Sequence, residues 1–401
     1  MTTTMSPVNA THLQGAADAR LAAVVDRLDG FLREDDDLSF QVAAFHRGVP
    51  VLDAWGGPHL TGTSVLIPFS VTKNTIGLSV GLLLERGLID LDERVAHYWP
   101  EFAAKGKDAV TVRQLLSHQA GLPQATTALT WDELWDHHAA AARLADTRPY
   151  WYPGSAFGYH AITIGSLGDE LVYRVTGRTL HEFYEDEIRA PHDVDFYLGL
   201  PEDQEHRFAP LRPMIRPVSA TGTPQFSALG PVVFGALSRD IDHTNSPRNY
   251  RYGHGATAGT GTARGLARLF AAAVTGVDGR APFLSADTVE QIGQQQIRGY
   301  DEVLHQHDRA HAIVFQKPSQ QLSFGGPRAF GHDGAAGALA CADPDTGITF
   351  AWTIVRGRWP GGGRPARRRP GARARRASGS DSMTAVITSL RAELRHDSAV
   401  V

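Results

Sequence analysis

The sequence Ile67-Pro68-Phe69-Ser70-Val71-Thr72-Lys73-Asn74 is followed directly by an apolar run at residues 75–84. A helix that begins at this serine puts Ser70 and Lys73 one turn apart on the same face. A hydroxyl is a weak nucleophile at its own pKa and needs a base within hydrogen-bond reach. A lysine that is partly removed from water loses its proton more easily, and the positive end of the helix macrodipole favours the same change. The stretch therefore predicts a serine nucleophile with a lysine partner, which is the chemistry of acyl transfer.

The Ser-x-x-Lys spacing alone is also typical of a helix N-cap serine followed by a solvated lysine, so further groups are needed. In residues 151–160 a Pro-Gly turn precedes an aromatic-rich loop that can present Tyr159 to a cleft. A phenol acts as a general base where nearby cations hold it as phenolate. The alternative is a buried core tyrosine with a satisfied hydroxyl.

A third segment, residues 330–338, carries His332 and several glycines before a strand of small residues. Glycine lets a substrate come close to backbone N–H groups. This edge can therefore supply one donor to an oxyanion, and the N–H of Ser70 can supply the other. The alternative is an ordinary glycine-rich turn that leads into a strand.

Together these segments resemble the serine β-lactamase and penicillin-recognising superfamily, in its class C and esterase branch. The resemblance covers about residues 16–355 and depends on Ser70-Val71-Thr72-Lys73, Leu115-Leu116-Ser117-His118-Gln119-Ala120-Gly121-Leu122, Pro153-Gly154 with Tyr159, and His332-Asp333-Gly334. It implies that Ser70 is the nucleophile, Lys73 its activating partner and Tyr159 the base that later protonates the leaving group. It also implies an acyl-enzyme that water or another acceptor resolves, without a metal or a cofactor.

At the third motif the resemblance implies that His332 and Gly334 line the strand and that the N–H of Ala335 is an oxyanion donor. Two departures from the family pattern bear on the substrate. Ala161 stands where members that act on β-lactams or peptides usually carry Asn, and His332-Asp333-Gly334 replaces Lys-Thr-Gly. A largely neutral histidine beside a negative aspartate attracts a substrate carboxylate less than a lysine does. The sequence therefore predicts a serine carboxylesterase for small or medium esters.

Other functions stay open as alternatives. An acyltransferase could use the same three residues, and a β-lactamase or a D-aminopeptidase-type amidohydrolase could share the acyl-enzyme. A non-catalytic binding protein could keep the same fold. A second serine, Ser79, lies in Gly77-Leu78-Ser79-Val80-Gly81, which fits the G-x-S-x-G pattern of α/β-hydrolases. That pattern needs a strand–turn–helix context, whereas Ser79 is predicted to lie inside the helix behind Ser70.

A metal-dependent hydrolase is a further alternative. The histidines that could serve it are His305, His307 and His311, or the pair His137 and His138. No H-E-x-x-H glutamate accompanies them, so exposed histidines of a polar loop are predicted, and neither a metal nor a cofactor is expected.

Composition limits the classes of partner. A chain of 401 residues, 42% of them hydrophobic, can bury a large core as one catalytic unit with two lobes. Its formal charge of -4 argues against a nucleic-acid partner, and the single cysteine, Cys341, excludes an internal disulfide framework. Residues 1–20 hold no apolar signal-peptide core, and no run of about eighteen apolar residues could span a membrane. A cytoplasmic protein that acts on a small-molecule ester is expected, and the oligomeric state is not indicated.

The predicted fold class is α/β (α+β), of the β-lactamase/transpeptidase-like type. Strands are predicted at residues 40–46, 49–55, 337–343 and 348–355. Helices are predicted at residues 16–33, 262–274 and 383–395, and the helix behind Ser70 is predicted to end near Gly87. Residues 344–347, Pro-Asp-Thr-Gly, are predicted to form the turn between the last two strands. Because strands stand at both ends of the chain, we expect an antiparallel sheet flanked by helices, with a mainly helical lobe inserted between them.

The domain boundaries follow from these elements. They are a disordered tail at 1–14, an α/β lobe made of 15–110 and 260–355, a helical lobe at 111–259, an Arg/Gly/Pro-rich disordered insertion at 356–380, and a C-terminal helix and tail at 381–401. The insertion has almost no apolar residue, so it could not form a core. An anion-binding or partner-binding arm is the alternative for that stretch.

Overall fold

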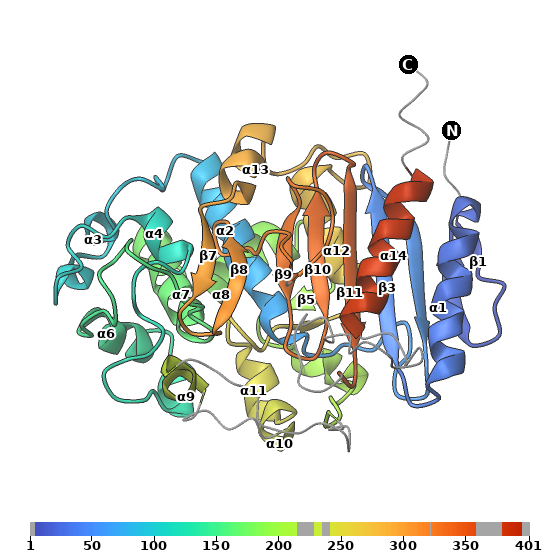
Figure 1. Cartoon of the computed structure of the whole chain (residues 1–401), viewed down its shortest axis with the longest axis horizontal. Helices are drawn as coiled ribbons and strands as arrows, with labels where there is room; N and C mark the ends of the chain where they lie inside the picture. Colours follow the sequence, from blue (N-terminus) through green and yellow to red (C-terminus); the bar gives the residue numbers. More distant parts are fainter. Residues whose placement is uncertain (1–4, 215–227, 235–240, 321, 358–378, 395–401) are drawn as a thin grey trace.

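Strands from the two ends of the chain pair in one antiparallel sheet, as the sequence predicts (Figure 1). The structure, a computed structural model, describes residues 5–214, 228–234, 241–320, 322–357 and 379–394. Within that part of the chain the main sheet has seven strands in the order β1-β2-β4-β3-β11-β10-β9. Its strands are β1 Ser6–Pro7, β2 Leu13–Ala17, β3 Phe40–His46, β4 Val49–Gly56, β9 Phe330–Asp333, β10 Leu339–Asp343 and β11 Ile348–Ile354.

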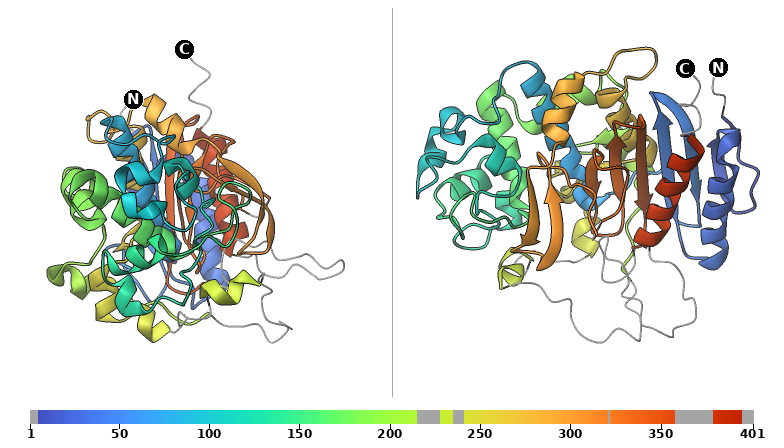
Figure 2. Two further views of the ribbon diagram at one scale, coloured as in Figure 1. Left: turned by 90° about the vertical axis from the view of Figure 1, so that its left-hand side faces the viewer. Right: turned by 45° about the horizontal axis from the view of Figure 1, so that its top comes forward.

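The central strands β3 and β11 are covered by helices on both faces. Val42 of β3 packs in a core that also contains α1 (Ala22–Glu34) and α14 (Gly379–Leu394). The next residue, Ala43, packs in the core that contains α12 (Ala263–Val274). Figure 2 shows α1 and α14 side by side along the sheet. A strand that is covered on both faces is a nearly continuous apolar run rather than an alternating one, and both central strands have this pattern.

Most of the other helices form the mainly helical part of the molecule, and α3, α4, α6 and α7 lie beyond the β9 edge of the sheet (Figure 1). The helices are α2 Lys73–Glu85, α3 Val95–Tyr98, α4 Val112–Leu116, α5 Trp131–Leu134, α6 Ala139–Ala145, α7 Thr163–Thr176, α8 Leu180–Tyr184, α9 Leu229–Phe234, α10 Ile241–Thr244, α11 Pro247–Tyr252 and α13 Ala286–Gly293. Two short strands, β5 Phe196–Tyr197 and β6 Thr260–Gly261, pair with each other.

The helix behind Ser70 is the element that the two parts share. α2 contacts α7 and α8 on the helical side and β9 on the sheet side. Every residue from Lys73 to Leu83 is buried, which accounts for the apolar run in the sequence. The helix ends near Gly87, as predicted, because Gly87 adopts a left-handed φ of 64°. Leu88 N–H then donates to Leu83 O (2.9 Å) and closes the helix end.

A hairpin that the sequence did not predict extends the edge of the sheet beside α2. It consists of β7 (Ile297–Asp301) and β8 (Gln306–His311). Gln316 bridges the hairpin to the main sheet, because it pairs with His311 on one side and with Gly331 of β9 on the other. The residues of both strands are mostly polar, and no apolar alternation marks them as strands.

The predicted disordered tail at residues 1–14 is wrong for its described part. From Ser6 onward the chain forms β1 and β2, and β2 pairs with β4. Leu13 is only 2% exposed, and the buried Asp29 carboxylate accepts the N–H groups of His12 (2.7 Å) and Leu13 (3.2 Å). The segment Leu-Gln-Gly-Ala-Ala has a weak strand propensity, so pairing with distant residues rather than local preference orders it.

Two other boundaries differ from the prediction. The helix expected from residue 16 begins at Ala22, because residues 16 and 17 belong to β2. Asp18 then caps an intervening 3₁₀ turn by accepting the Arg20 N–H (2.9 Å). The helical part also begins before residue 111, because α3 packs against α7.

The arginine-rich stretch at 356–380 lies outside the described residues except at its two ends, and so do residues 395–401. At the first end, Arg356 pairs with Asp35 (3.5 Å) and Asp37 (2.9 Å). At the other end, α14 begins at Gly379. Over the described ranges, no helix combines the length and the apolarity needed to cross a bilayer.

Truncation of a buried side chain on β2 tests the contribution of this strand to the fold. Leu13→Ala should lower the free energy of unfolding by about 2–5 kcal/mol, as is usual for a buried leucine. Gln14→Ala, at an exposed position of the same strand, should change it by less than about 0.5 kcal/mol. Urea unfolding followed by circular dichroism measures both variants. If Leu13→Ala unfolds like the wild type, β2 contributes nothing to the core.

Candidate active site

Ser70 lies where a short 3₁₀ turn, Phe69–Thr72, runs into α2. Phe69, the residue before it, has a φ of 52°. Bulky residues rarely adopt this left-handed region, and they keep it only where the surrounding structure holds them. Ser70 itself is half-buried, so its hydroxyl can meet a substrate that comes from solvent.

Lys73 is fully buried one helical turn beyond Ser70. Its Nζ lies 3.1 Å from Ser70 Oγ, 2.8 Å from Ala161 O and 2.9 Å from Ala256 O. Burial lowers the pKa of Lys73 well below its ordinary value, and the nearby Asp333 only partly opposes this shift. The structure therefore brings the hydroxyl and the amine together, in surroundings that favour the neutral amine.

Tyr159 joins this pair from a distant segment of the chain. Lys73 Nζ lies 4.9 Å from the centroid of its ring, and its hydroxyl is 3.4 Å from His332 Nε2. Burial raises the pKa of Tyr159 above its ordinary value, although a hydrogen bond with Ser70 opposes the shift. On the sequence alone, this phenol was expected to act as a general base only where nearby cations hold it as phenolate. The structure does not meet this condition. The phenol is protonated at neutral pH because burial disfavours its charged form.

His332 lies on β9 and directs its Nε2 toward Tyr159. Its Nδ1 is 2.7 Å from Asp333 O. Because a carbonyl oxygen can only accept, we assign the ring hydrogen to Nδ1, which leaves Nε2 as an acceptor. Burial, together with the neighbouring Lys73, lowers the pKa of His332 well below its ordinary value. The third motif therefore presents a neutral imidazole.

Gly334 packs the third motif against the turn that carries Ser70. A Cβ atom at this position would lie 2.0 Å from Pro68 O, which is closer than any side chain allows. The Gly337 N–H donates to Gly334 O (2.8 Å), so residues 334–337 form a tight turn. Ala335 is an exposed residue of that turn. Ala335, whose N–H is the expected second oxyanion donor, is therefore the residue directly after the glycine that contacts the Ser70 turn.

Two histidines that the motifs contain, but to which the sequence assigned no role, hold the Tyr159 loop. His160 Nδ1 donates to Gly158 O (2.6 Å), and its Nε2 accepts the Leu122 N–H (2.8 Å). Burial lowers the pKa of His160 to about 4, so the neutral ring keeps both bonds. His118 accepts the His160 N–H (3.2 Å) and lies edge-on to Tyr159, with 5.3 Å between ring centroids. The sequence signal that could have identified His118 and His160 as site residues is their position inside the quoted motifs.

Asp301, at the end of β7, anchors the backbone of Tyr159 from the other side. Its fully buried carboxylate accepts the N–H groups of Tyr159 (3.1 Å), Val303 (2.9 Å) and Leu304 (2.7 Å). Desolvation raises the pKa of Asp301 in spite of these donors. Because 142 residues separate it from Tyr159, no local pattern could have identified it.

The rival serine does not join the site. Ser79 is fully buried inside α2, and over the described residues its hydroxyl has no hydrogen-bond partner. His305 and His307 are exposed, as predicted. His311 is fully buried, contrary to the prediction, because β8 packs it against His118 with 4.7 Å between ring centroids.

Comparison with known proteins identifies the family of the chain. The beta-lactamase family model matches residues 26–373. The esterase/beta-lactamase LipL of Mycobacterium tuberculosis is 31% identical over 366 residues, which are 84% of this chain and 81% of LipL. The chain therefore belongs to the beta-lactamase family, as the resemblance of its motifs implies.

Two solved structures share the fold over nearly the whole chain. EstA from Arthrobacter nitroguajacolicus Rue61a has a TM-score of 0.86 and 38% identity, and the match covers 97% of this chain and 100% of EstA. A family VIII carboxylesterase has a TM-score of 0.83 and 25% identity, and the match covers 94% of this chain and 99% of that protein. The similarity thus includes both the sheet and the helical part.

A methyl group at Gly334 tests whether its contact with Pro68 positions the site. Gly334→Ala must push the turn away from Ser70, so labelling of Ser70 by a fluorophosphonate probe should slow by about 10- to 1,000-fold, the upper end being the usual effect of losing one oxyanion donor. Gly30→Ala, on α1, is the control, because its backbone is not in the left-handed region and its Cβ would meet only the end of the Arg33 side chain at 3.5 Å, an ordinary contact. Intact-protein mass spectrometry gives the labelling rates. Wild-type labelling of Gly334→Ala would contradict the assignment.

Proposed function

We propose that this protein is a serine carboxylesterase that hydrolyses small or medium esters through an acyl-enzyme at Ser70. The observation that carries the proposal is the buried Lys73, whose Nζ lies 3.1 Å from Ser70 Oγ. Membership of the beta-lactamase family supports it, and two relatives carry the words esterase or carboxylesterase in their names.

Lys73 can act as the base in its neutral form. A neutral amine has two N–H donors and one lone pair. Ala161 O and Ala256 O can only accept, so they take the two hydrogens. The lone pair is left for the third neighbour, and the Ser70 hydroxyl donates to it across the 3.1 Å separation. A protonated lysine has no lone pair and could not take this proton.

Acylation of Ser70 follows from this arrangement. Ser70 Oγ forms a bond to the ester carbonyl carbon while its proton passes to Lys73 Nζ. The N–H groups of Ser70 and Ala335 bind the oxyanion. The protonated phenol of Tyr159 then gives its proton to the leaving alkoxide as the C–O bond breaks, and it recovers a proton from Lys73. The products are an alcohol, acyl-Ser70 and a neutral Lys73.

Deacylation uses the same groups in the opposite direction. A water molecule attacks the acyl carbon, and its proton passes through Tyr159 to the neutral Lys73. Ser70 Oγ recovers a proton from Lys73 as the acyl bond breaks, and the carboxylic acid leaves. His332 Nε2, which accepts from the phenol when no substrate is bound, orients Tyr159 for both steps.

The third motif favours a neutral ester over an anionic substrate. His332 is neutral because burial lowers its pKa, and the residue after it, Asp333, carries a carboxyl group rather than the positive charge that would attract a carboxylate. Ala161 offers a methyl group where members that act on β-lactams or peptides carry Asn. The competing functions are transfer of the acyl group to an alcohol, hydrolysis of amides, and binding without catalysis. A panel of substrates distinguishes them.

A substrate panel tests the proposed activity. p-Nitrophenyl acetate and butyrate should be hydrolysed, and a cephalosporin and a D-alanyl anilide should have a kcat/KM at least about 100-fold lower, because their polar groups find no partner. Ser70→Ala should lower kcat by at least about 1,000-fold. Ser79→Ala, the control serine, should keep the wild-type rate.

Each other outcome of the panel assigns a different function. Faster turnover of the cephalosporin than of the esters would overturn the choice of substrate. An added alcohol that captures the acyl group in place of water would make the protein an acyltransferase. Absence of both turnover and fluorophosphonate labelling of the intact protein would make it a binding protein.

The pH dependence of ester hydrolysis follows from the lysine. Burial holds the pKa of Lys73 well below its ordinary value of 10.5, and only the neutral amine can take the Ser70 proton. kcat/KM should therefore rise with pH through the pKa of Lys73 and reach its plateau below about pH 10, and it should fall as acid protonates the lysine. In the control, His332→Gln, the midpoint should stay within about 0.5 pH unit, because a neutral imidazole adds no charge. A rate that rises only above about pH 10 would exclude Lys73 as the base.

A further inference from the structure

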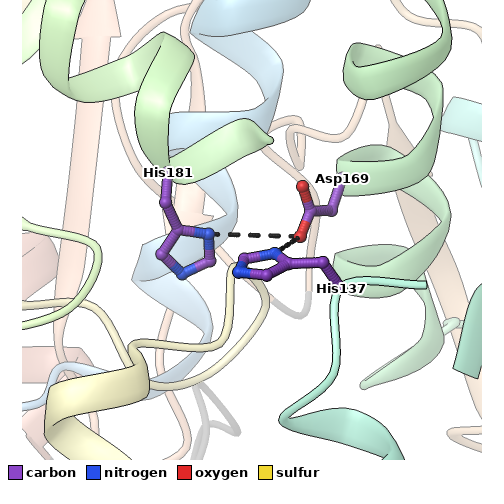
Figure 3. Close-up of side chains that lie close together, drawn as sticks. All are labelled: His137, Asp169 and His181. Atoms are coloured by element: carbon purple, nitrogen blue, oxygen red, sulfur yellow. Dashed lines mark hydrogen bonds and ion pairs between the residues drawn. The ribbon is translucent and has the colours of Figure 1, made fainter. Parts of the chain in front are cut away.

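Three metal-ligating side chains meet outside the catalytic site (Figure 3). His137 comes from the segment between α5 and α6, Asp169 from α7 and His181 from α8. Asp169 Oδ2 lies 2.6 Å from His137 Nδ1 and 4.0 Å from His181 Nδ1. One ligand atom from each residue falls within 4.8 Å of the other two. Three separate elements therefore direct two imidazoles and one carboxylate to a common point.

The orientation of His181 leaves a lone pair at this point. Its Nε2 lies 2.9 Å from Tyr252 O and 3.0 Å from Gly253 O. Carbonyl oxygens can only accept, so Nε2 carries the ring hydrogen and Nδ1 carries the lone pair. His181 Nδ1 is buried and has no hydrogen-bond partner among the described residues. It faces the oxygen of Asp169, and two electron-rich atoms in this position repel each other unless a cation lies between them.

Asp169 is oriented as a metal-ligating carboxylate usually is. Its Oδ1 accepts the Leu180 N–H (2.6 Å), which fixes the group and leaves Oδ2 for the two histidines. The Asp169 side chain is 7% exposed and His137 is 30% exposed. An ion can therefore reach the cluster from solvent on the His137 side, and water can complete its coordination.

We propose that His137, Asp169 and His181 bind a divalent transition metal ion of the zinc class. Two imidazole nitrogens and one carboxylate oxygen suit zinc, with water as the fourth ligand. Zinc bonds of about 2.0–2.1 Å set tetrahedral ligand atoms about 3.3 Å apart. The ligand atoms lie within 4.8 Å of one another, so their separations need to change by at most about 1.5 Å. When His137 Nδ1 binds the ion, the ring hydrogen is carried by Nε2: a neutral ring exchanges its Nδ1 hydrogen for one on Nε2 through solvent, and an imidazolium releases its Nδ1 proton.

The role of this ion is structural. It ties α7 and α8 to the segment that carries His137. Through the bonds of His181 to Tyr252 O and Gly253 O, it also fixes the start of residues 252–256. The same segment supplies Ala256 O to Lys73. The sequence paired His137 with His138, but His138 Nδ1 is engaged by Glu170 (2.7 Å) and does not belong to the cluster.

Titration of the full chain with Zn²⁺, after treatment with a chelator, tests the proposal. Isothermal titration calorimetry should show that the wild type binds one equivalent of Zn²⁺. His137→Gln and His181→Gln should each bind Zn²⁺ about 100-fold more weakly. Loss of a residue that only hydrogen-bonds a metal ligand already lowers affinity by up to about 100-fold, and loss of the ligand itself should cost at least as much. His138→Gln is the matched control and should bind like the wild type. Zn²⁺ should raise the midpoint temperature of thermal unfolding for the wild type and for His138→Gln, but not for His137→Gln or His181→Gln.

A second measurement keeps the test independent of the variants' folding. Co²⁺ bound to the wild type should give the intense visible absorption of a tetrahedral site, and Zn²⁺ should abolish it at one equivalent. The proposal is overturned if the wild type binds no stoichiometric Zn²⁺ or Co²⁺, or if His138→Gln weakens binding as much as His181→Gln does.

Discussion

The burial of Lys73 is the constraint on which the rest of the site depends. An ammonium group that is removed from water is costly, so a buried lysine tends to lose its proton. Here α2 carries the amine into the interior, where two backbone carbonyls accept its hydrogens. The same burial keeps Tyr159 a phenol, because it disfavours the charged form of each group. One environment thus favours a neutral amine and a neutral phenol near the Ser70 hydroxyl, which is what the proposed mechanism requires of a base and an acid.

Three consecutive residues of one loop serve this arrangement through different contacts. Asp301 holds the backbone of Tyr159, the ring of His160 ties the loop to Leu122, and Ala161 O receives the lysine. Each of these contacts is buried, and a buried polar network that is satisfied holds its members in one geometry. The loop is therefore rigid because of its partners in other segments.

The second acceptor of Lys73 belongs to residues 252–256, which also contact His181. Tyr252 O and Gly253 O orient the imidazole, and Ala256 O receives the amine. Protein interiors are close-packed and transmit small displacements between neighbours. His181 of the cluster and Lys73 thus contact the same stretch of backbone, so a displacement at the cluster would be passed to the surroundings of Lys73.

The sequence by itself determined the features that depend on near neighbours. The Ser70–Lys73 spacing, the end of α2 at Gly87 and the turn at 344–347 follow from helical period and turn chemistry within a few residues, and the four motifs marked the family. Only the tertiary structure decided the order of residues 6–17, the burial of His311 and the contacts of Asp301, because these come from pairing between distant segments. It also decided that the surroundings of Lys73 and Tyr159 disfavour their charged forms, because desolvation exists only after the chain has packed.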